Sequence, residues 1–148
     1  MFMKKNILLL SLILMTMSAF SQSVTIDSRL YAKYSEEDLL EIQRVNPLDI
    51  EYMNWFVDNA FVVKEINNPE SSAFPKLRYM DKETKMAGAE VTEYNPETFN
   101  VMECDFEVSA KSSNVYLIGN TGKLLTFYSS EDLIKLFNEY RRRHNENE

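Results

Sequence analysis

Apolar residues follow two different spacings along this chain. Around residues 34–59 and 130–143 they recur three or four positions apart, which is typical of an amphipathic helix. Between residues 87 and 127 they alternate with polar residues, which is typical of a strand with one buried face. The pattern therefore predicts helices, then strands and then a final helix, and this order is that of an α+β protein.

Two of the predicted helices begin with nearly the same sequence. Residues 34–42 read YSEEDLLEI, and residues 128–136 read YSSEDLIKL. In each copy the serine hydroxyl is placed to accept a hydrogen bond from the free backbone N–H three residues later. The preceding tyrosine is placed to pack against the leucine of the first full turn. We interpret the repeat as one helix-start signal used twice, and the alternative is a pair of acidic docking sites.

The three predicted helices differ in how much of their surface is apolar. The first is expected to start after Ser35, the second to span residues 47–59 with Asn46 as its cap, and the last to span residues 130–143. Apolar side chains cover most of the second helix, which predicts a central position for it. The last helix has one apolar stripe, formed by Leu133, Leu136, Phe137 and Tyr140.

Amino-acid composition predicts the secondary structure of three other segments that precede the alternating region. Residues 22–33 are interpreted as an extended lead-in to the first helix. Residues 61–66, which read FVVKEI, are rich in β-branched and aromatic side chains and predict a strand. Residues 67–80 contain two prolines and several small polar side chains, so they are expected to form a loop.

Three turns divide the alternating region into hairpins. They are placed at residues 95–98, 110–113 and 120–122, where proline, small polar residues and glycine gather. In this register small apolar side chains face large ones on one side of the sheet. The predicted fold is an antiparallel meander of four or five strands, with two N-terminal helices and one C-terminal helix packed on one face. The facing pairs are Tyr94 with Phe99, Val91 with Met102, Ala89 with Cys104, Val108 with Val115, and Leu117 with Leu125.

The N-terminus has the order of a secretory signal peptide. Two lysines precede an apolar run over residues 7–17, and small residues lead up to Ser21. The run is shorter than the roughly 20 residues that a membrane-spanning helix needs. We therefore predict cleavage after Ser21, a periplasmic or secreted location, and one domain over residues 22–148 with a frayed tail at 144–148. The alternative is an uncleaved anchor, through which alone the chain would meet a membrane.

Charge and cysteine content narrow the range of partners. The net charge of −7 becomes −9 once the two lysines of the signal peptide are removed. An acidic domain repels nucleic acid and anionic lipid, so neither is an expected partner. Cys104 is the only cysteine, so an internal disulfide is impossible and stability must come from burial.

Common catalytic and cofactor-binding motifs are missing from the sequence. Residues 119–126, GNTGKLLT, have two residues rather than four between the glycines, which does not fit a phosphate-binding loop. His144 is the only histidine and is expected in the tail, which leaves no His-based triad or zinc site. Cys104 is expected in the core, where a thiol acts as a small apolar group. We therefore predict a non-enzymatic protein without a cofactor or metal.

Acidic side chains alternate along the strand that contains Cys104. Glu103, Asp105 and Glu107 are expected on the face opposite the core, and the register places Glu90 directly across from Glu103. Facing like charges are unfavourable, and a cation, a basic partner or a neighbouring lysine would relieve them. The simplest interpretation is a solvated sheet face on which water and salt screen the repulsion.

Aromatic side chains share this outer face with the acids. They are either covered by the lead-in or part of an interaction surface. We predict an exported, non-enzymatic domain that binds a protein or small ligand there. The alternatives are a small hydrolase with paired carboxylates, which needs a concave site, and a self-associating structural subunit of a cell-envelope assembly. The candidate binding residues are Glu90, Tyr94, Phe99, Glu103, Asp105 and Tyr116.

Overall fold

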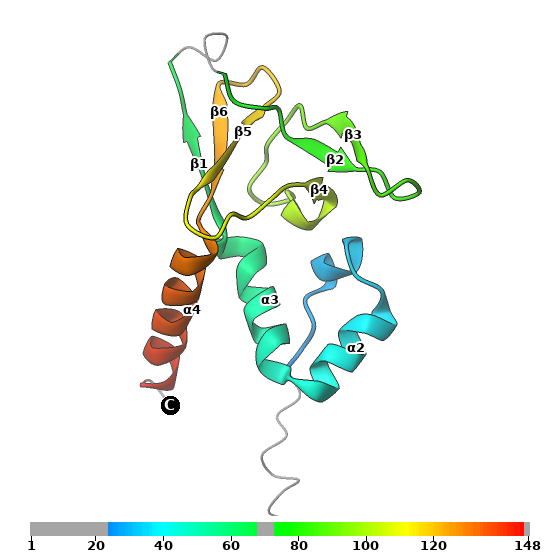
Figure 1. Ribbon diagram of the computed structural model, residues 1–148, viewed down its shortest axis with the longest axis vertical. Helices are drawn as coiled ribbons and strands as arrows, with labels where there is room; N and C mark the ends of the chain where they lie inside the picture. The colour runs from blue at the N-terminus through cyan, green and yellow to red at the C-terminus, as the bar shows by residue number, and fades with distance from the viewer. Residues whose placement is uncertain (1–23, 68–72, 147–148) are drawn as a thin grey trace, which may run out of the picture.

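The structure is a computed structural model that describes residues 24–67 and 73–146 (Figure 1). The predicted signal peptide, its cleavage after Ser21 and the last two residues lie outside the described residues. Among the described residues, no helix has the length and apolarity needed to cross a membrane. The helices gather at one end of the molecule and the strands at the other, as Figure 1 shows.

All three predicted α-helices are present, and the lead-in is partly helical where an extended segment was expected. Instead of being extended throughout, the lead-in contains a short 3₁₀ helix, η1, which packs against the second α-helix. Its N-cap is Asp27, whose side chain accepts a hydrogen bond from the backbone N–H of Arg29. The helices are η1 (Ser28–Ala32), α2 (Glu36–Val45), α3 (Pro47–Asn59) and α4 (Ser130–Asn145).

The twin sequences do start two helices. Ser35 Oγ accepts a hydrogen bond from the Asp38 backbone N–H at 3.1 Å, and Ser129 Oγ accepts one from Asp132 at 3.2 Å. Their surroundings differ, because Ser35 is exposed whereas only 2% of Ser129 is exposed. The Ser129 hydroxyl also donates to the Asp132 carboxylate at 2.9 Å. The same local signal is therefore coupled to the core in the second copy alone.

Replacing each cap serine with alanine should separate these two environments. We expect Ser129→Ala to lower the free energy of unfolding by about 1–2 kcal/mol, the upper part of the range for a lost cap. Ser35→Ala should cost about 0.5–1 kcal/mol, because water replaces the lost acceptor at an exposed site. Urea denaturation followed by circular dichroism measures both values. Equal losses would show that burial of the second cap adds nothing.

The strands form two small antiparallel sheets rather than one meander. The first sheet has the strand order β1-β6-β5, and the second has the order β3-β2-β4. The prediction of a single sheet with four or five strands is therefore wrong. The first sheet consists of β1 (Phe61–Glu65), β5 (Asn114–Ile118) and β6 (Lys123–Phe127), and the second of β2 (Arg78–Met80), β3 (Ala87–Glu90) and β4 (Cys104–Asp105).

The main cause of the error is β2, which lies in the segment predicted to be a loop. This strand inserts between β3 and β4, so Arg78 pairs with Glu90 on one side and with Asp105 on the other. Ala89 and Cys104 therefore do not face each other. Three residues are too few to give a recognisable alternation, and a strand's alternation does not specify its partner.

The predicted turns are only partly correct. The turn at 95–98 exists, with the Phe99 N–H bonded to the Asn95 carbonyl at 2.8 Å, but strands do not flank it. Residues 106–109 are not in a strand, so the pairing of Val108 with Val115 is wrong. The last hairpin is present with a four-residue loop at 119–122, which shifts the register by one and places Leu117 opposite Leu124.

A short parallel contact joins the two sheets. The Leu77 N–H donates to the Leu117 carbonyl at 2.7 Å, and the Leu117 N–H donates to the Pro75 carbonyl at 2.8 Å. The Leu77 carbonyl in turn accepts from the Val91 N–H at 2.9 Å. Leu77 is fully buried at this junction. Residues 75–80 thus extend the first sheet at their start and form the middle of the second at their end.

One hydrophobic core connects the helices with both sheets. Phe127 is its largest fully buried side chain, and its ring stacks on Phe106 with centroids 4.4 Å apart. Cys104 is fully buried, as predicted. The α4 stripe is only partly buried, because Leu136 remains 37% exposed. The buried members from the helices are Leu30, Leu39, Ile50, Trp55, Val57, Leu133 and Phe137.

Candidate functional site

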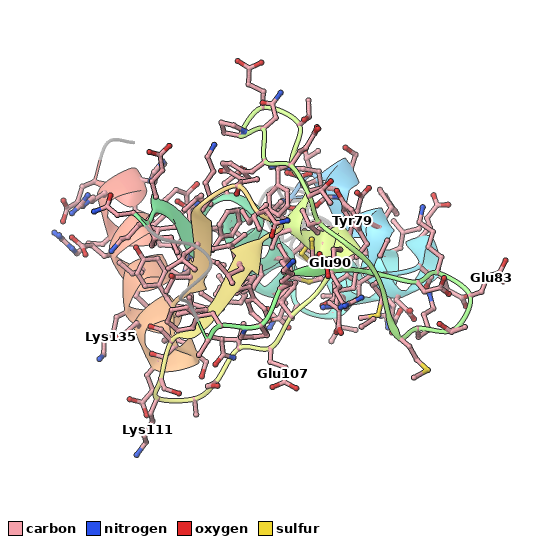
Figure 2. All side chains as sticks on the ribbon, turned by 90° about the horizontal axis from the view of Figure 1, so that it is seen from above. Tyr79, Glu83, Glu90, Glu107, Lys111 and Lys135 are labelled. Atoms are coloured by element: carbon pink, nitrogen blue, oxygen red, sulfur yellow. The ribbon has the colours of Figure 1, made fainter. Side chains whose placement is uncertain are left out.

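The predicted opposition of Glu90 and Glu103 does not occur. Glu90 pairs in the sheet with Arg78, and its carboxylate lies 3.6 Å from the Arg78 guanidinium and 3.3 Å from Lys76 Nζ. Arg78 of β2 and Lys76 just before it therefore supply the cations next to this acid. Figure 2 shows Glu90 near the middle of the molecule, whereas Glu83 and Glu107 extend outwards at its margin.

The aromatic candidates pack against the core. Tyr94 and Phe99 meet at a centroid distance of 5.2 Å, and Phe99 also contacts Phe61 at 5.8 Å. The Tyr116 ring lies against Phe127, and its hydroxyl accepts a hydrogen bond from the Glu107 backbone N–H at 2.9 Å. These three side chains are partly buried, and contacts within the chain account for them.

Glu103 and Asp105 lie instead beside a groove that the sequence did not indicate. The groove, here named the Lys33 groove, consists of two neighbouring cavities that share Lys33 and Met102. The first has a volume of about 160 Å³ and is otherwise lined by Tyr34, Tyr52, Met53, Phe56 and Phe106. The second has a volume of about 200 Å³ and is otherwise lined by Ala32, Met80, Lys85 and Cys104.

The lead-in holds Lys33 in place through several contacts. Asn54 on α3 accepts from the Asp27 backbone N–H at 2.9 Å and donates to the Thr25 carbonyl at 2.6 Å. Arg29 bridges Asp27 and Asp58, at 2.7 and 2.6 Å, and these carboxylates raise the pKa of its guanidinium. Lys33 is the C-cap of η1, so its backbone is fixed relative to α3.

The Lys33 ammonium lies over an aromatic ring, and no described carboxylate is within ion-pair distance of it. Its Nζ is 4.3 Å from the centroid of the Phe106 ring, within the range of a cation–π contact. Among the described ion pairs none involves Lys33. Burial of the ammonium lowers the pKa of Lys33, and the charge of Asp105 opposes this effect in part. Lys33 as a whole residue is nevertheless exposed, so the groove presents a positive charge that a ligand can reach.

The far end of the groove is formed by the hairpin between β2 and β3. Lys85 there has a φ of +57°, an unusual value for a residue with a side chain. Asp81 stabilises the turn, because its Oδ1 accepts from the Glu83 and Thr84 backbone N–H groups at 3.0 and 2.7 Å. The hydrogen bonds from Thr84 lower the pKa of Asp81. A third cavity, lined by Tyr79, Lys82 and Glu103 among others, continues beyond Lys85.

The groove has an apolar wall and a weakly reactive floor. The Phe56 ring stacks on Phe106 with centroids 6.1 Å apart. Burial raises the pKa of the Cys104 thiol to about 12, so the thiol stays protonated at neutral pH and is a poor nucleophile. No group of three or more His, Cys, Asp or Glu side chains that would suit a metal ion occurs in the described parts of the chain. The arrangement is suited to holding a ligand.

A larger cavity, of about 360 Å³, lies between α3 and the C-terminal part of α4. Its charged side chain Glu139 and its histidine have partners within the chain. Glu139 forms an ion pair with Arg143, and the His144 Nδ1 lies 2.8 Å from the Tyr140 carbonyl oxygen. The Lys33 groove differs from this larger cavity because the charge of Lys33 has no ion pair among the described residues. Such a charge would select a ligand of opposite sign.

Comparisons with protein-family models, with curated proteins and with solved structures find no match for this chain. Within the sequence, the one sign of the groove is a lysine between two tyrosines, at residues 31–34. Lys33 lies over Phe106, 73 positions later, and shares the second cavity with Met80 and Lys85, which are in or near a segment expected to be a loop. Spacing along the chain does not indicate that these segments meet.

Proposed function

We propose that the protein is an exported, non-enzymatic binding domain that holds a small ligand in the Lys33 groove. The observation that carries the proposal is the position of the Lys33 ammonium, which faces an aromatic ring in an apolar concavity and has no ion-pair partner among the described residues. Export is inferred from the signal-peptide pattern before Ser21.

The surroundings of Lys33 support binding over structure alone. Lys33 is exposed, and its ammonium stands over the Phe106 ring at the edge of an apolar cavity, where a ligand can reach it. Concave sites with an apolar lining and few polar groups are the usual form of ligand sites in proteins. The predicted acids Glu103 and Asp105 then belong to the surroundings of the groove, not to a flat sheet face.

A neutral fluorescent probe tests the groove without assuming the charge of its ligand. We expect N-phenyl-1-naphthylamine to bind residues 22–148 saturably at one site. Tyr34→Ala should weaken this binding about five- to tenfold, because the Tyr34 side chain lines the first cavity. Fluorescence titration measures the dissociation constants, and circular dichroism checks that each variant is folded.

Tyr31→Ala is the matched control for this titration. Tyr31 lies three positions earlier in the same segment, is 45% exposed and is not among the residues that line the groove. Its replacement should leave the dissociation constant of the probe unchanged. Failure to saturate, or equal weakening by both variants, would contradict binding in the groove.

A further inference from the structure

We propose that the ligand of the Lys33 groove is a small amphipathic monoanion, an aromatic or medium-chain aliphatic carboxylate, whose charged end meets Lys33. This inference rests on the proposed function and adds the chemical class of the ligand. The apolar body of the ligand would lie in the first cavity against Phe56 and Phe106.

The charge of the ligand follows from the two lysines of the groove. Lys33 is common to both cavities, and Lys85 lines the second one. A bound carboxylate would form the ion pair that Lys33 lacks among the described residues, and a charge-assisted hydrogen bond of this kind is stronger than a neutral one. A neutral ligand would form no ion pair with the ammonium and would lack this contribution to binding.

The apolar part of the ligand follows from the lining of the first cavity. Tyr52 and Phe56 lie 6.1 Å apart, and Phe56 stacks on Phe106 at an interplanar angle of 23°. Met53 and Met102 add flexible thioether side chains, which adapt to ligands of different shape. A hydrophilic anion has no apolar surface to bury against this wall, so it would gain no hydrophobic contribution to binding.

The cavities also limit the size of the ligand and the number of charges that it carries. Each cavity, at about 160 or 200 Å³, is smaller than the roughly 300–1,000 Å³ of sites for drug-sized ligands. Phosphate sites in proteins present several donors together, often backbone N–H groups at a helix N-terminus. Only one ammonium serves the first cavity. A single negative charge on a short apolar body matches this arrangement better than a polyanion does.

Competition between a matched acid and alcohol tests the proposal. Octanoate and 1-octanol have the same chain length and differ in charge at neutral pH. We expect octanoate to displace N-phenyl-1-naphthylamine from residues 22–148 at concentrations about tenfold lower than 1-octanol does. Lys33→Met should keep an apolar side chain of similar length, retain the probe and remove this preference. Lys33→Arg should preserve the preference, because it keeps the positive charge.

Lys111→Met is the control for an unspecific effect of charge. Lys111 is exposed and points away from the molecule in Figure 2. Its replacement changes the net charge as Lys33→Met does and should leave the tenfold preference intact.

Equal displacement by the acid and the alcohol in the wild type would overturn the ligand class and leave the groove as a binding site. A probe that does not bind saturably at all would instead overturn the proposed function. An unchanged preference in Lys33→Met would show that another cation selects the anion and would overturn the assignment to Lys33.

Discussion

Replacing Phe127 with alanine is expected to lower the free energy of unfolding by about 3–5 kcal/mol, the range for a large buried aromatic side chain. Phe127 is fully buried, and its ring contacts three others. The contacts are with Phe61 at 5.9 Å, Phe106 at 4.4 Å and Tyr116 at 6.0 Å. Removing the ring would leave a cavity where β6 meets the residues after β4, and the protein around it would close only partly.

Urea denaturation at neutral pH measures this loss against two other variants. Phe127→Leu fills most of the same volume, so it should cost clearly less than alanine does. Tyr31→Ala removes an aromatic side chain that is 45% exposed and should change the stability by no more than about 0.5–1 kcal/mol. A loss below about 1 kcal/mol for Phe127→Ala would show that this ring is not at the centre of the core.

The same residue also supports the candidate site. Phe106 stacks with both Phe56 and Phe127, and the Lys33 ammonium lies over the Phe106 ring. The wall of the groove is therefore continuous with the hydrophobic core. A wall that is packed against the core holds the ammonium in a more precise position than a mobile loop would.

Replacing Gly119 with alanine is expected to destabilise the protein by about 3 kcal/mol, for two reasons that add. Gly119 has a φ of +49°, where a residue with a Cβ costs about 1–2 kcal/mol. A Cβ at this position would also lie 3.0 Å from Thr92 Cα and 3.2 Å from the Thr92 carbonyl oxygen. Because these are backbone atoms, the strand connection must shift, and such overpacking typically costs about 1–3 kcal/mol.

Gly88→Ala is the matched control, measured by the same urea denaturation. Gly88 lies in β3 without a positive φ, so alanine there has an ordinary backbone conformation. Its Cβ would meet the Tyr79 carbonyl oxygen at 3.3 Å, which requires only a small adjustment. We expect a change within about 1 kcal/mol. A loss for Gly119→Ala as small as that for Gly88→Ala would mean that the two sheets are not in close contact at Thr92.

The candidate site shows why the predicted surface was misplaced. Alternation along the chain correctly placed Cys104 inside, and Glu103 is exposed as predicted. The partner of that strand was wrong, however, and with it the neighbours of every acid. Glu90 was expected to face Glu103, but it faces Arg78 instead. The repulsion between two carboxylates on which the predicted site depended is therefore replaced by ion pairs with Arg78 and Lys76.

The sequence by itself determined the features of this protein that depend on neighbours a few residues apart. The start of α2 at Ser35, the full extent of α3, the start of α4 and the strand β1 follow from caps, from periodicity and from β-branched residues. The caps and the periodicity of the helices involve residues within about one turn of each other, so the chain specifies them directly. The composition of residues 61–65 indicates a strand, although the partner of that strand, β6, lies far along the chain.

Only the tertiary structure decided which strands pair and what surrounds Lys33. The pairing of β2 with β3 and β4, and the contact of Lys33 with Phe106, join residues that lie far apart in the sequence. An alternating strand fits many partners equally well, and the choice depends on how the whole core packs. The Lys33 groove is therefore a property of the folded chain, formed where the lead-in, α3 and the second sheet come together.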